Sequence, residues 1–315
     1  MADENRVFHV GPEEGGIGIN RAIAQCGKKG GEVVLKAGTY ECRAPVIIRD
    51  SGVTLRGAGP LTKLRLAANA DCPVLIVGDA ANAPRRTVRS ICVADLAIDG
   101  NRTRQKSECW KGQCDTDSST AIRCSGLVVR RAKDVLVLRV SADNCRSGGL
   151  VTEKHCRRLA VREFHSGHNE FDGLACYETE DSVFSGLYLH DNRSAGISTD
   201  LNFDHSIISD SRLVRNGTHG IFMRNSCDNR FQHILISGCG RDGLFIDQVD
   251  EATRTNSSRN QFAGVTVTGS KGAALRVNAA SCKGTVLTQC LFTGNKQGLL
   301  EAVPGLVDQQ SLVVK

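Results

Sequence analysis

The sequence predicts an all-β protein in which a single domain, residues 1–315, winds as a right-handed parallel β-helix. Three observations support this fold class. A glycine returns every 23 or 24 residues, an asparagine follows nearly the same interval, and the composition suits a narrow stacked core. We expect one coil of about 23–24 residues per repeat.

The glycine repeat opens five similar apolar segments, which start at Gly149, Gly173, Gly196, Gly220 and Gly243. Each interval holds short β-branched runs separated by Asn, Asp, Ser and Gly, as expected for three short strands per coil. No stretch with helical periodicity is long enough to cross back over a sheet, which excludes a doubly wound α/β fold. The coils should therefore pair through parallel ladders.

The asparagine repeat consists of Asn144, Asn169, Asn192 and Asn216. A buried side-chain amide can bond to its counterpart one coil away, and Asn tolerates the backbone of a tight turn. We therefore expect these four residues to have a structural role.

The composition agrees with this fold and limits the partners. Ten Phe, three Tyr and one Trp stand against 33 Gly, and the net charge is +6 without a dense Lys/Arg run. This charge permits binding to an acidic polymer but does not indicate nucleic acid. No apolar run approaches the ~18–20 residues of a membrane-spanning helix. We expect an acidic glycan as substrate, no nucleic-acid or membrane partner, and a monomer.

The N-terminal residues, Met1-Ala-Asp-Glu-Asn-Arg, are polar and do not form a signal peptide. The sequence therefore leaves the localisation open: the cytoplasm, or secretion or the periplasm if a leader was removed. The 14 cysteines do not decide between these compartments, because most lie in strand-like runs, where Cys behaves as a small buried hydrophobe. Cys109 and Cys114 lie in a polar loop and could form a disulfide, whereas a zinc site lacks ligand spacing.

The repeat also predicts an outward face. The residue after each repeat glycine is apolar and should point inward. Side chains alternate along a strand, so the residue three positions after this inward residue should point outward. Neighbouring members of such a column lie ~4.8 Å apart. The column consists of Glu153, Tyr177, Asp200, Arg224 and Asp247.

Further polar and aromatic residues accompany this column. A second column precedes the glycines and includes Asp172, His219 and Asp242, while Phe222 and Phe245 stack one coil apart on the same face. Such a face suits an extended sugar chain, but it is also typical of a solvated sheet whose alternating charges stabilise each other. Surface or turn packing is expected for His165, His168, His190, His205 and His233.

Four segments depart from the coil pattern. Apolar residues near helical spacing predict a helix over residues 16–27, which would cap the first coil. Residues 101–120 form a loop over the groove along the outward face, and 249–259 are an insertion in the turn after Gly243. The C-terminal segment from Leu312 closes the other end.

Three segments carry a family resemblance. They read Gly31-Glu-Val-Val-Leu-Lys-Ala-Gly-Thr-Tyr40, Gly52-Val-Thr-Leu-Arg-Gly-Ala-Gly59 and Asp95-Leu-Ala-Ile-Asp-Gly-Asn-Arg102, the last followed by Lys106-Ser-Glu-Cys-Trp110. Over roughly residues 14–300 the chain resembles the catalytic module of mannuronan (alginate) C5-epimerases, within the pectate-lyase-like β-helix superfamily. The first two segments recur through that superfamily, whereas the third resembles the epimerase loop. The resemblance implies that Lys106, Glu108 and Trp110 face the substrate, and His219 matches a rim histidine.

One motif departs from that family. The epimerases carry their acid/base pair in a Tyr-Gly-Phe-Asp-Pro-His motif, where this chain has Gly148-Gly-Leu-Val-Thr-Glu153. Gly148, Val151 and Glu153 replace the tyrosine, aspartate and histidine, which excludes an epimerase that uses the same machinery unchanged. Tyr177 stands where the family has a carboxylate, one coil further along, so the acid/base groups could be rearranged. The chain lacks Asp-rich nonapeptide repeats, so we expect no cofactor, although the resemblance allows Ca²⁺.

The chemistry that fits is C5-epimerisation or β-elimination of a uronate. It needs a cation to neutralise the carboxylate, a base for the C5 proton and a second proton-transfer group. A tyrosine of pKa near 10 would need a neighbouring cation to act as base. The candidate catalytic residues are Tyr177, His219, Glu153 and Asp200. The candidate substrate-binding residues are Lys106, Glu108, Trp110, Asp172, Arg224, Phe222, Phe245 and Asp247.

Other functions stay open at this point. Glu153 and Asp200 are two coils apart, or ~9.6 Å, near the upper limit of ~6.5–9.5 Å for the carboxyl pair of an inverting glycoside hydrolase. A non-catalytic β-helix could instead bind a glycan or pack in an assembly, and small-molecule chemistry on this scaffold is a further alternative.

Overall fold

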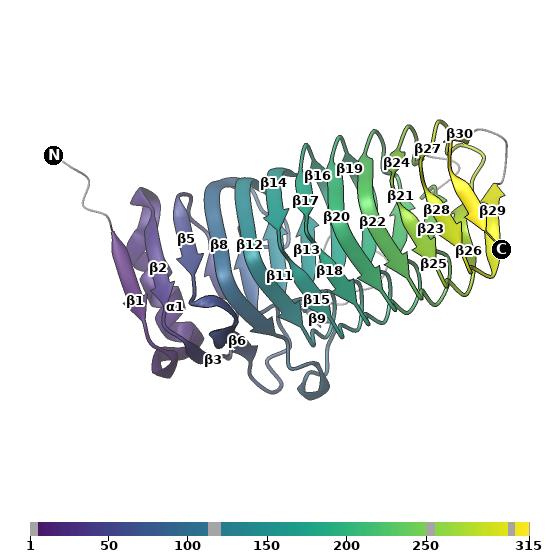
Figure 1. The fold of residues 1–315 in the computed structure, drawn as a ribbon. Helices are drawn as coiled ribbons and strands as arrows, with labels where there is room; N and C mark the ends of the chain where they lie inside the picture. The colour runs from purple at the N-terminus through teal and green to yellow at the C-terminus, as the bar shows by residue number, and fades with distance from the viewer. Residues whose placement is uncertain (1–5, 113–120, 250–255, 302–305, 315) are drawn as a thin grey trace. The chain divides into compact units, whose positions relative to one another are not determined.

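The structure is a computed structural model that describes residues 6–112, 121–249, 256–301 and 306–314. Contacts divide the chain into two compact units, Met1–His165 and Ser166–Lys315. Each unit consists of right-handed parallel β-helix coils, which confirms the predicted fold class (Figure 1). That the chain forms one domain stays a prediction.

The first unit contains α1 (Gly15–Cys26) and strands β1–β14. The strands are β1 (Val7–Val10), β2 (Gly31–Leu35), β3 (Gly38–Cys42), β4 (Val46–Ile48), β5 (Val53–Arg56), β6 (Thr62–Leu66), β7 (Leu75–Val77), β8 (Val88–Asp99), β9 (Cys109–Trp110), β10 (Ile122–Arg123), β11 (Leu127–Arg130), β12 (Ala132–Asp143), β13 (Leu150–Glu153) and β14 (Cys156–Arg162). Parallel ladders run β1–β2–β5–β8–β12–β14, β3–β6–β8 and β4–β7–β11–β13. The short β9–β10 pair is antiparallel.

The second unit continues the pattern with shorter, more regular coils. After β15 (His165–Gly167), its strands are β16 (Leu174–Glu180), β17 (Val183–Ser185), β18 (Tyr188–His190), β19 (Ile197–Asp204), β20 (Ile207–Val214), β21 (Ile221–Arg224), β22 (Arg230–Ser237), β23 (Leu244–Asp247), β24 (Gln261–Ala263), β25 (Thr266–Thr268), β26 (Ala273–Val277), β27 (Val286–Thr288), β28 (Leu291–Thr293), β29 (Gln297–Glu301), β30 (Val307–Gln309) and β31 (Leu312–Val314). Its three parallel faces are β16–β19–β21–β23–β26–β29, β17–β20–β22–β24–β27–β30 and, through β18 and β20, β22–β25–β28–β31.

The core of the second unit is a set of columns that run from coil to coil. Ile197, Ile221, Leu244 and Leu275 are register partners and are each at most 1% exposed. The repeat glycines stack beside this column. A Cβ on Gly220 would lie 2.7 Å from the carbonyl oxygen of Gly243, so a side chain does not fit where the coils approach. The predicted inward orientation is therefore confirmed.

The asparagine ladder is confirmed for three of its four members. Asn169 Nδ2 donates to Asn192 Oδ1 at 2.8 Å, and Asn192 Nδ2 donates to Asn216 Oδ1 at 3.0 Å. All three are buried, whereas Asn144 is exposed and has a φ of 54°. The prediction for Asn144 was wrong because the buried position in that turn belongs to the next residue, Cys145.

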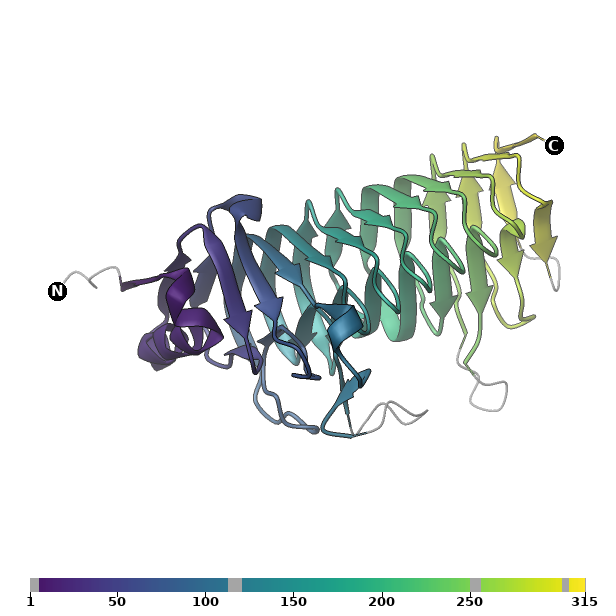
Figure 2. The ribbon, with the colours of Figure 1, turned by 90° about the horizontal axis from the view of Figure 1, so that it is seen from below.

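The ends of the coil stack differ from each other. Helix α1 lies beside β1 and β2 at the N-terminal end, as predicted, and Ile19, Ile23 and Cys26 bury its inner face (Figure 2). Ile17 is 69% exposed and does not belong to that face. At the C-terminal end the side chains of β31 are exposed. No helix within the described ranges has the length and apolar character needed to cross a bilayer.

The cysteines follow the prediction where the structure describes them. The free cysteines are buried except for the half-buried Cys92 and Cys227. Burial raises their pKa, for example to about 12 for Cys239, so they are inert thiols. Cys109 is disulfide-bonded, and Cys114 lies outside the described residues, as do parts of the predicted 101–120 loop and 249–259 insertion.

The buried ladder predicts a large cost for breaking it. Asn192→Ala removes a donor and an acceptor from the interior and leaves the facing amides without those bonds. We expect the free energy of unfolding to fall by about 2–4 kcal/mol in urea denaturation, because each buried unsatisfied polar group costs ~1–3 kcal/mol. The matched control is the exposed Asn278, whose replacement by Ala should change stability by less than about 0.5 kcal/mol. Equal effects of the two variants would contradict the ladder's role.

Candidate functional site

The outward face of β16, β19, β21, β23 and β26 carries the side chains that the sequence singled out in the second unit. Strand alternation places two rows on it, because the first and third residues after each inward position both point outward. The aromatic row consists of Ser198, Phe222, Phe245 and Arg276, and the ionisable row consists of Tyr177, Asp200, Arg224 and Asp247. Asp172, His219 and Asp242 lie where the turns enter these strands.

The aromatic row forms a flat stacked platform. The rings of Phe222 and Phe245 are 5.4 Å apart and nearly parallel, at 6°. The His219 ring lies 4.8 Å from Phe245, and the Arg224 guanidinium lies over the other end, 5.1 Å from the Phe222 ring centroid. Both phenylalanines are half-buried. The predicted stacking is confirmed, and an imidazole and a guanidinium border the platform.

His219 is a nearly buried candidate acid/base group beside this platform. It is 6% exposed, and its Nδ1 has no hydrogen-bond partner among the described residues. Burial lowers the pKa of His219 to about 4, and the nearby Asp242 carboxylate, 3.9 Å away, only partly offsets that effect. The imidazole is therefore neutral at physiological pH and can accept a proton.

Asp242 connects the turn that enters β23 to the aromatic row. Arg276 Nε donates to its Oδ2 at 2.9 Å, and the backbone N–H of Ala273 donates to its Oδ1 at 2.6 Å. Asp172 accepts two similar hydrogen bonds. The backbone N–H of Ala195 donates to its Oδ1 and the hydroxyl of Ser198 donates to its Oδ2, both at 2.7 Å. These carboxylates have fixed orientations.

The ionisable row is less open than predicted. Asp200 was expected to be solvent-accessible but is 5% exposed, because Arg224 from the next coil covers it and donates to its Oδ2 from Nε at 3.1 Å. Burial raises the pKa of Asp200 above its ordinary value although Arg224 and a bond from the N–H of Leu201 lower it. Tyr177, the register partner of Asp200, is half-buried, as are Arg224 and Asp247. Arg224 is thus already paired with a carboxylate.

Glu153 lies in the first unit and contradicts the prediction of an exposed base. It is 8% exposed and forms an ion pair at 2.5 Å with Arg130, whose side chain is fully buried. Arg130 also donates to the carbonyls of Asp79, Ala81 and Asn82. Removal of either partner would leave the other charge buried without a counter-charge, so the pair has a structural role.

The predicted substrate loop also belongs to the first unit. The backbone N–H of Lys106 donates to Asp71 Oδ1 at 2.6 Å, and its side chain is exposed. Glu108 is ion-paired with Arg123. Trp110 lies under the ammonium of Lys111, at 3.9 Å, and both line a pocket of about 370 Å³ with Arg49. Whether this loop faces a substrate stays a prediction.

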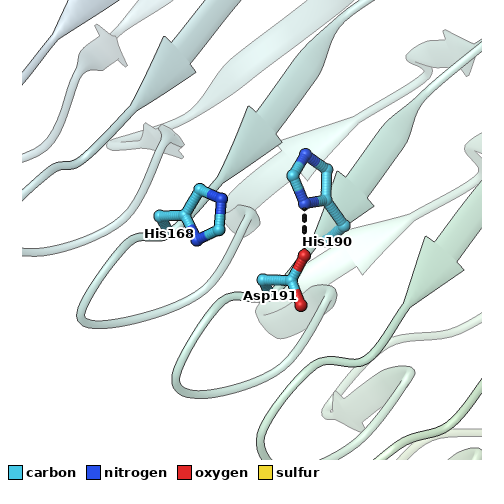
Figure 3. Close-up of side chains that lie close together, drawn as sticks. All are labelled: His168, His190 and Asp191. Atoms are coloured by element: carbon cyan, nitrogen blue, oxygen red, sulfur yellow. Dashed lines mark hydrogen bonds and ion pairs between the residues drawn. The ribbon is translucent and has the colours of Figure 1, made fainter.

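A further cluster was missed by the sequence analysis. His168, His190 and Asp191 come together at one turn of the second unit, and each offers a ligand atom within 4.8 Å of the others (Figure 3). The sequence analysis assigned these histidines to surface or turn packing. The signal was nonetheless present, because Asp191 follows His168 by 23 residues, which is one coil.

The Glu153–Arg130 pair predicts a structural phenotype. Glu153→Gln leaves a fully buried guanidinium without its counter-charge, so the free energy of unfolding should fall by about 3–5 kcal/mol in chemical denaturation. Asp134→Asn is the control, since Asp134 pairs with Arg158 on the surface of the same unit and its replacement should change the free energy of unfolding little. A fully stable Glu153→Gln protein would show that Glu153 has no structural role.

His219 predicts a pH-dependent stability. The unfolded histidine titrates near pH 6.5 and the folded one near 4, so between these values the unfolded state binds the extra proton. Stability from neutral His219 is complete above about pH 6.5 and declines as the pH falls towards 4. Relative to His219→Asn, the wild type should lose about 2 kcal/mol between pH 7 and pH 5 in urea denaturation. Parallel pH profiles of the two proteins would contradict the lowered pKa.

Comparisons with known proteins agree with the architecture. The family model described as right handed beta helix region matches residues 125–279 and 206–304. Similar solved structures include the A-module of the Azotobacter vinelandii mannuronan C-5 epimerase AlgE6, with 15% identity over 95% of each chain and a TM-score of 0.65. The open reading frame 18 protein of Geobacillus virus E2 shares 14% identity over 96% of this chain and 60% of its own, with a TM-score of 0.71.

A pectate lyase is also similar, with 12% identity over 97% of this chain and 79% of its own and a TM-score of 0.67. None of the curated proteins compared with the chain matches it. At these identities the similar structures establish the fold, and the family model covers more than half of the sequence. The chain belongs to the right-handed β-helix family.

Proposed function

We propose that the second unit binds a uronate-containing glycan along its outward face and abstracts the C5 proton of one uronate, as a C5-epimerase or a β-eliminating lyase does. The observation that carries this proposal is the Phe222–Phe245 platform, bordered by a neutral buried histidine and by arginines. Aromatic faces accept the apolar C–H faces of sugar rings, and a guanidinium pairs with a carboxylate in a planar fork.

The platform positions the sugar and the arginines act on its carboxylate. Arg276 is the register partner of Phe245 and is half-buried, so its guanidinium borders the ring face. Arg224 lies in the ionisable row, where it is the register partner of Asp247. A cation beside the substrate carboxylate acidifies the C5 proton, because it stabilises the negative charge that develops there. Either arginine would then share its charge between a protein carboxylate and the substrate.

The proton-transfer roles fall to His219, Tyr177 and Asp200. His219 is neutral, so its imidazole takes the C5 proton while the C–H electron pair moves toward the carboxylate. In elimination the C4–O bond then breaks, and an acid protonates the leaving oxygen. In epimerisation a proton returns to C5 from the opposite face. Asp200, whose pKa burial raises, and the phenol of Tyr177 are the candidate acids.

Two similar structures are named for such reactions, a mannuronan C-5 epimerase and a pectate lyase, and this likeness supports a glycan substrate. Hydrolysis is the second candidate, because the raised pKa of Asp200 also suits the acid of a glycoside hydrolase. Glu153 is a poor partner for that reaction, since it is buried in an ion pair with Arg130.

The test is turnover of a panel of acidic and neutral polysaccharides, with alginate and pectate as the acidic members. A lyase gives an ultraviolet-absorbing unsaturated product, an epimerase changes only the proton spectrum of the polymer, and a hydrolase gives reducing ends without absorbance. We expect His219→Asn and Tyr177→Phe to lose ~10²–10⁴-fold in rate, as for loss of a positioned acid or base. The replacement of Phe222 or Phe245 by Ala should weaken polymer binding.

The matched control is His205→Asn, which removes an exposed histidine from the same unit and should leave the rate unchanged. Full activity of both His219→Asn and Tyr177→Phe would refute the assigned roles. Inactive Asp200→Asn, combined with new reducing ends from the wild type, would indicate hydrolysis. Binding without turnover by the wild type would identify a non-catalytic glycan-binding protein.

A further inference from the structure

A second cluster of chemistry-bearing side chains lies away from the aromatic platform, on the turn that follows β15 and β18. His168 directly follows β15, His190 ends β18, and Asp191 begins the next turn. The backbone N–H of His168 donates to the carbonyl oxygen of His190 at 3.3 Å, which ties the two coils together at this point. Figure 3 shows the two imidazole rings and the carboxylate converging.

The spacing of the three ligand atoms suits one small ion. All lie within 4.8 Å of one another, and two nitrogen or oxygen ligands of a tetrahedral zinc ion lie ~3.3–3.6 Å apart, since each bond is ~2.0–2.2 Å long. His190 Nδ1 and Asp191 Oδ2 are already 2.7 Å apart. The His168 side chain is exposed, so a rotation of its ring closes the remaining distance.

Two of the three ligands have fixed orientations. Tyr188 stacks on the His190 ring at 4.5 Å, and a Cβ on Gly167 would lie 2.6 Å from that ring, so glycine makes room for it. Arg215 donates to both oxygens of Asp191, at 2.8 and 2.6 Å. Metal sites depend on such partners behind the ligands, which hold the donor atoms in place.

Arg215 is compatible with an ion at this position. Each carboxylate oxygen has two lone pairs, and Asp191 Oδ2 uses one for Arg215 and the other for His190. An ion that bridges His190 Nδ1 and Asp191 Oδ2 replaces the shared proton and leaves the Arg215 bonds intact. Because the Arg215–Asp191 pair is neutral, two imidazoles remain as the main donors. Imidazole nitrogen suits zinc and other late first-row ions, whereas Ca²⁺ and Mg²⁺ prefer oxygen.

We propose that His168, His190 and Asp191 form a binding site for one Zn²⁺-class ion, with the remaining coordination position open to water. The site links two adjacent coils and does not depend on the proposed glycan chemistry.

The test is zinc titration of untagged protein by calorimetry, with cobalt substitution to report the ligands through its visible spectrum. Wild type should bind one equivalent of Zn²⁺, and an excess of Ca²⁺ should not displace it. His168→Asn, chosen because Asn tolerates the φ of 58° at this position, should weaken binding at least ~10–100-fold and change the cobalt spectrum. The thermal unfolding of metal-free His168→Asn verifies that it is folded.

The chain offers a matched control at a different turn, the one that follows β19. His205 lies 4.0 Å from Asp228. Arg259 donates two hydrogen bonds to Asp228, as Arg215 does to Asp191. This arrangement contains one histidine instead of two. His205→Asn should bind zinc as the wild type does. The proposal is overturned if the wild type binds no stoichiometric zinc, if His168→Asn binds as tightly, if His205→Asn weakens binding equally, or if Ca²⁺ displaces the zinc.

Discussion

The parallel register between coils is the constraint on which the other features of each unit depend. Because each residue lies beside its equivalent on the next coil, a choice at one position becomes a column along the unit. In the second unit this produces the aliphatic core, the asparagine ladder and the aromatic row. It also requires a buried polar residue to find its partner one coil away, as Asn192 and Asp200 do. A column of one residue type is therefore stable where an isolated copy would not be.

The same register explains what the sequence could predict. Regular repeats identified the fold, the inward column, the glycine line and the Phe222–Phe245 stack, since each depends only on period and alternation. Alternation predicts the direction in which a side chain points, but not whether a neighbouring side chain lies over it. The burial of Asp200 by Arg224 was therefore not predicted. Arg130 is the register partner of Glu153 one coil earlier and was missed because the glycine repeat was not extended back to Gly126. The Asn144 error was a shift of one residue in a turn.

Arginine–aspartate pairs recur between successive coils, both within strands and at turns. In each pair the aspartate has a positive φ, which Asp tolerates, and the arginine one coil later donates to both of its oxygens. An exposed pair contributes about 0–1 kcal/mol, so its main effect is to orient a carboxylate. Only where histidines lie beside such a carboxylate does the turn gain ligands for an ion. The pairs are Arg139–Asp95, Arg158–Asp134, Arg215–Asp191 and Arg259–Asp228.

The asparagine ladder has a direction, because Asn169 donates to Asn192 and Asn192 donates to Asn216, each time to the following coil. Its amide dipoles are aligned head to tail, and such chains polarise one another. Nothing in this arrangement sets a number of members, in contrast to a closed barrel, where strand number and diameter are linked. A gene duplication that inserts one complete coil would extend the ladder and the core columns together. The fold can thus change the length of its outward face during evolution without redesigning its interior.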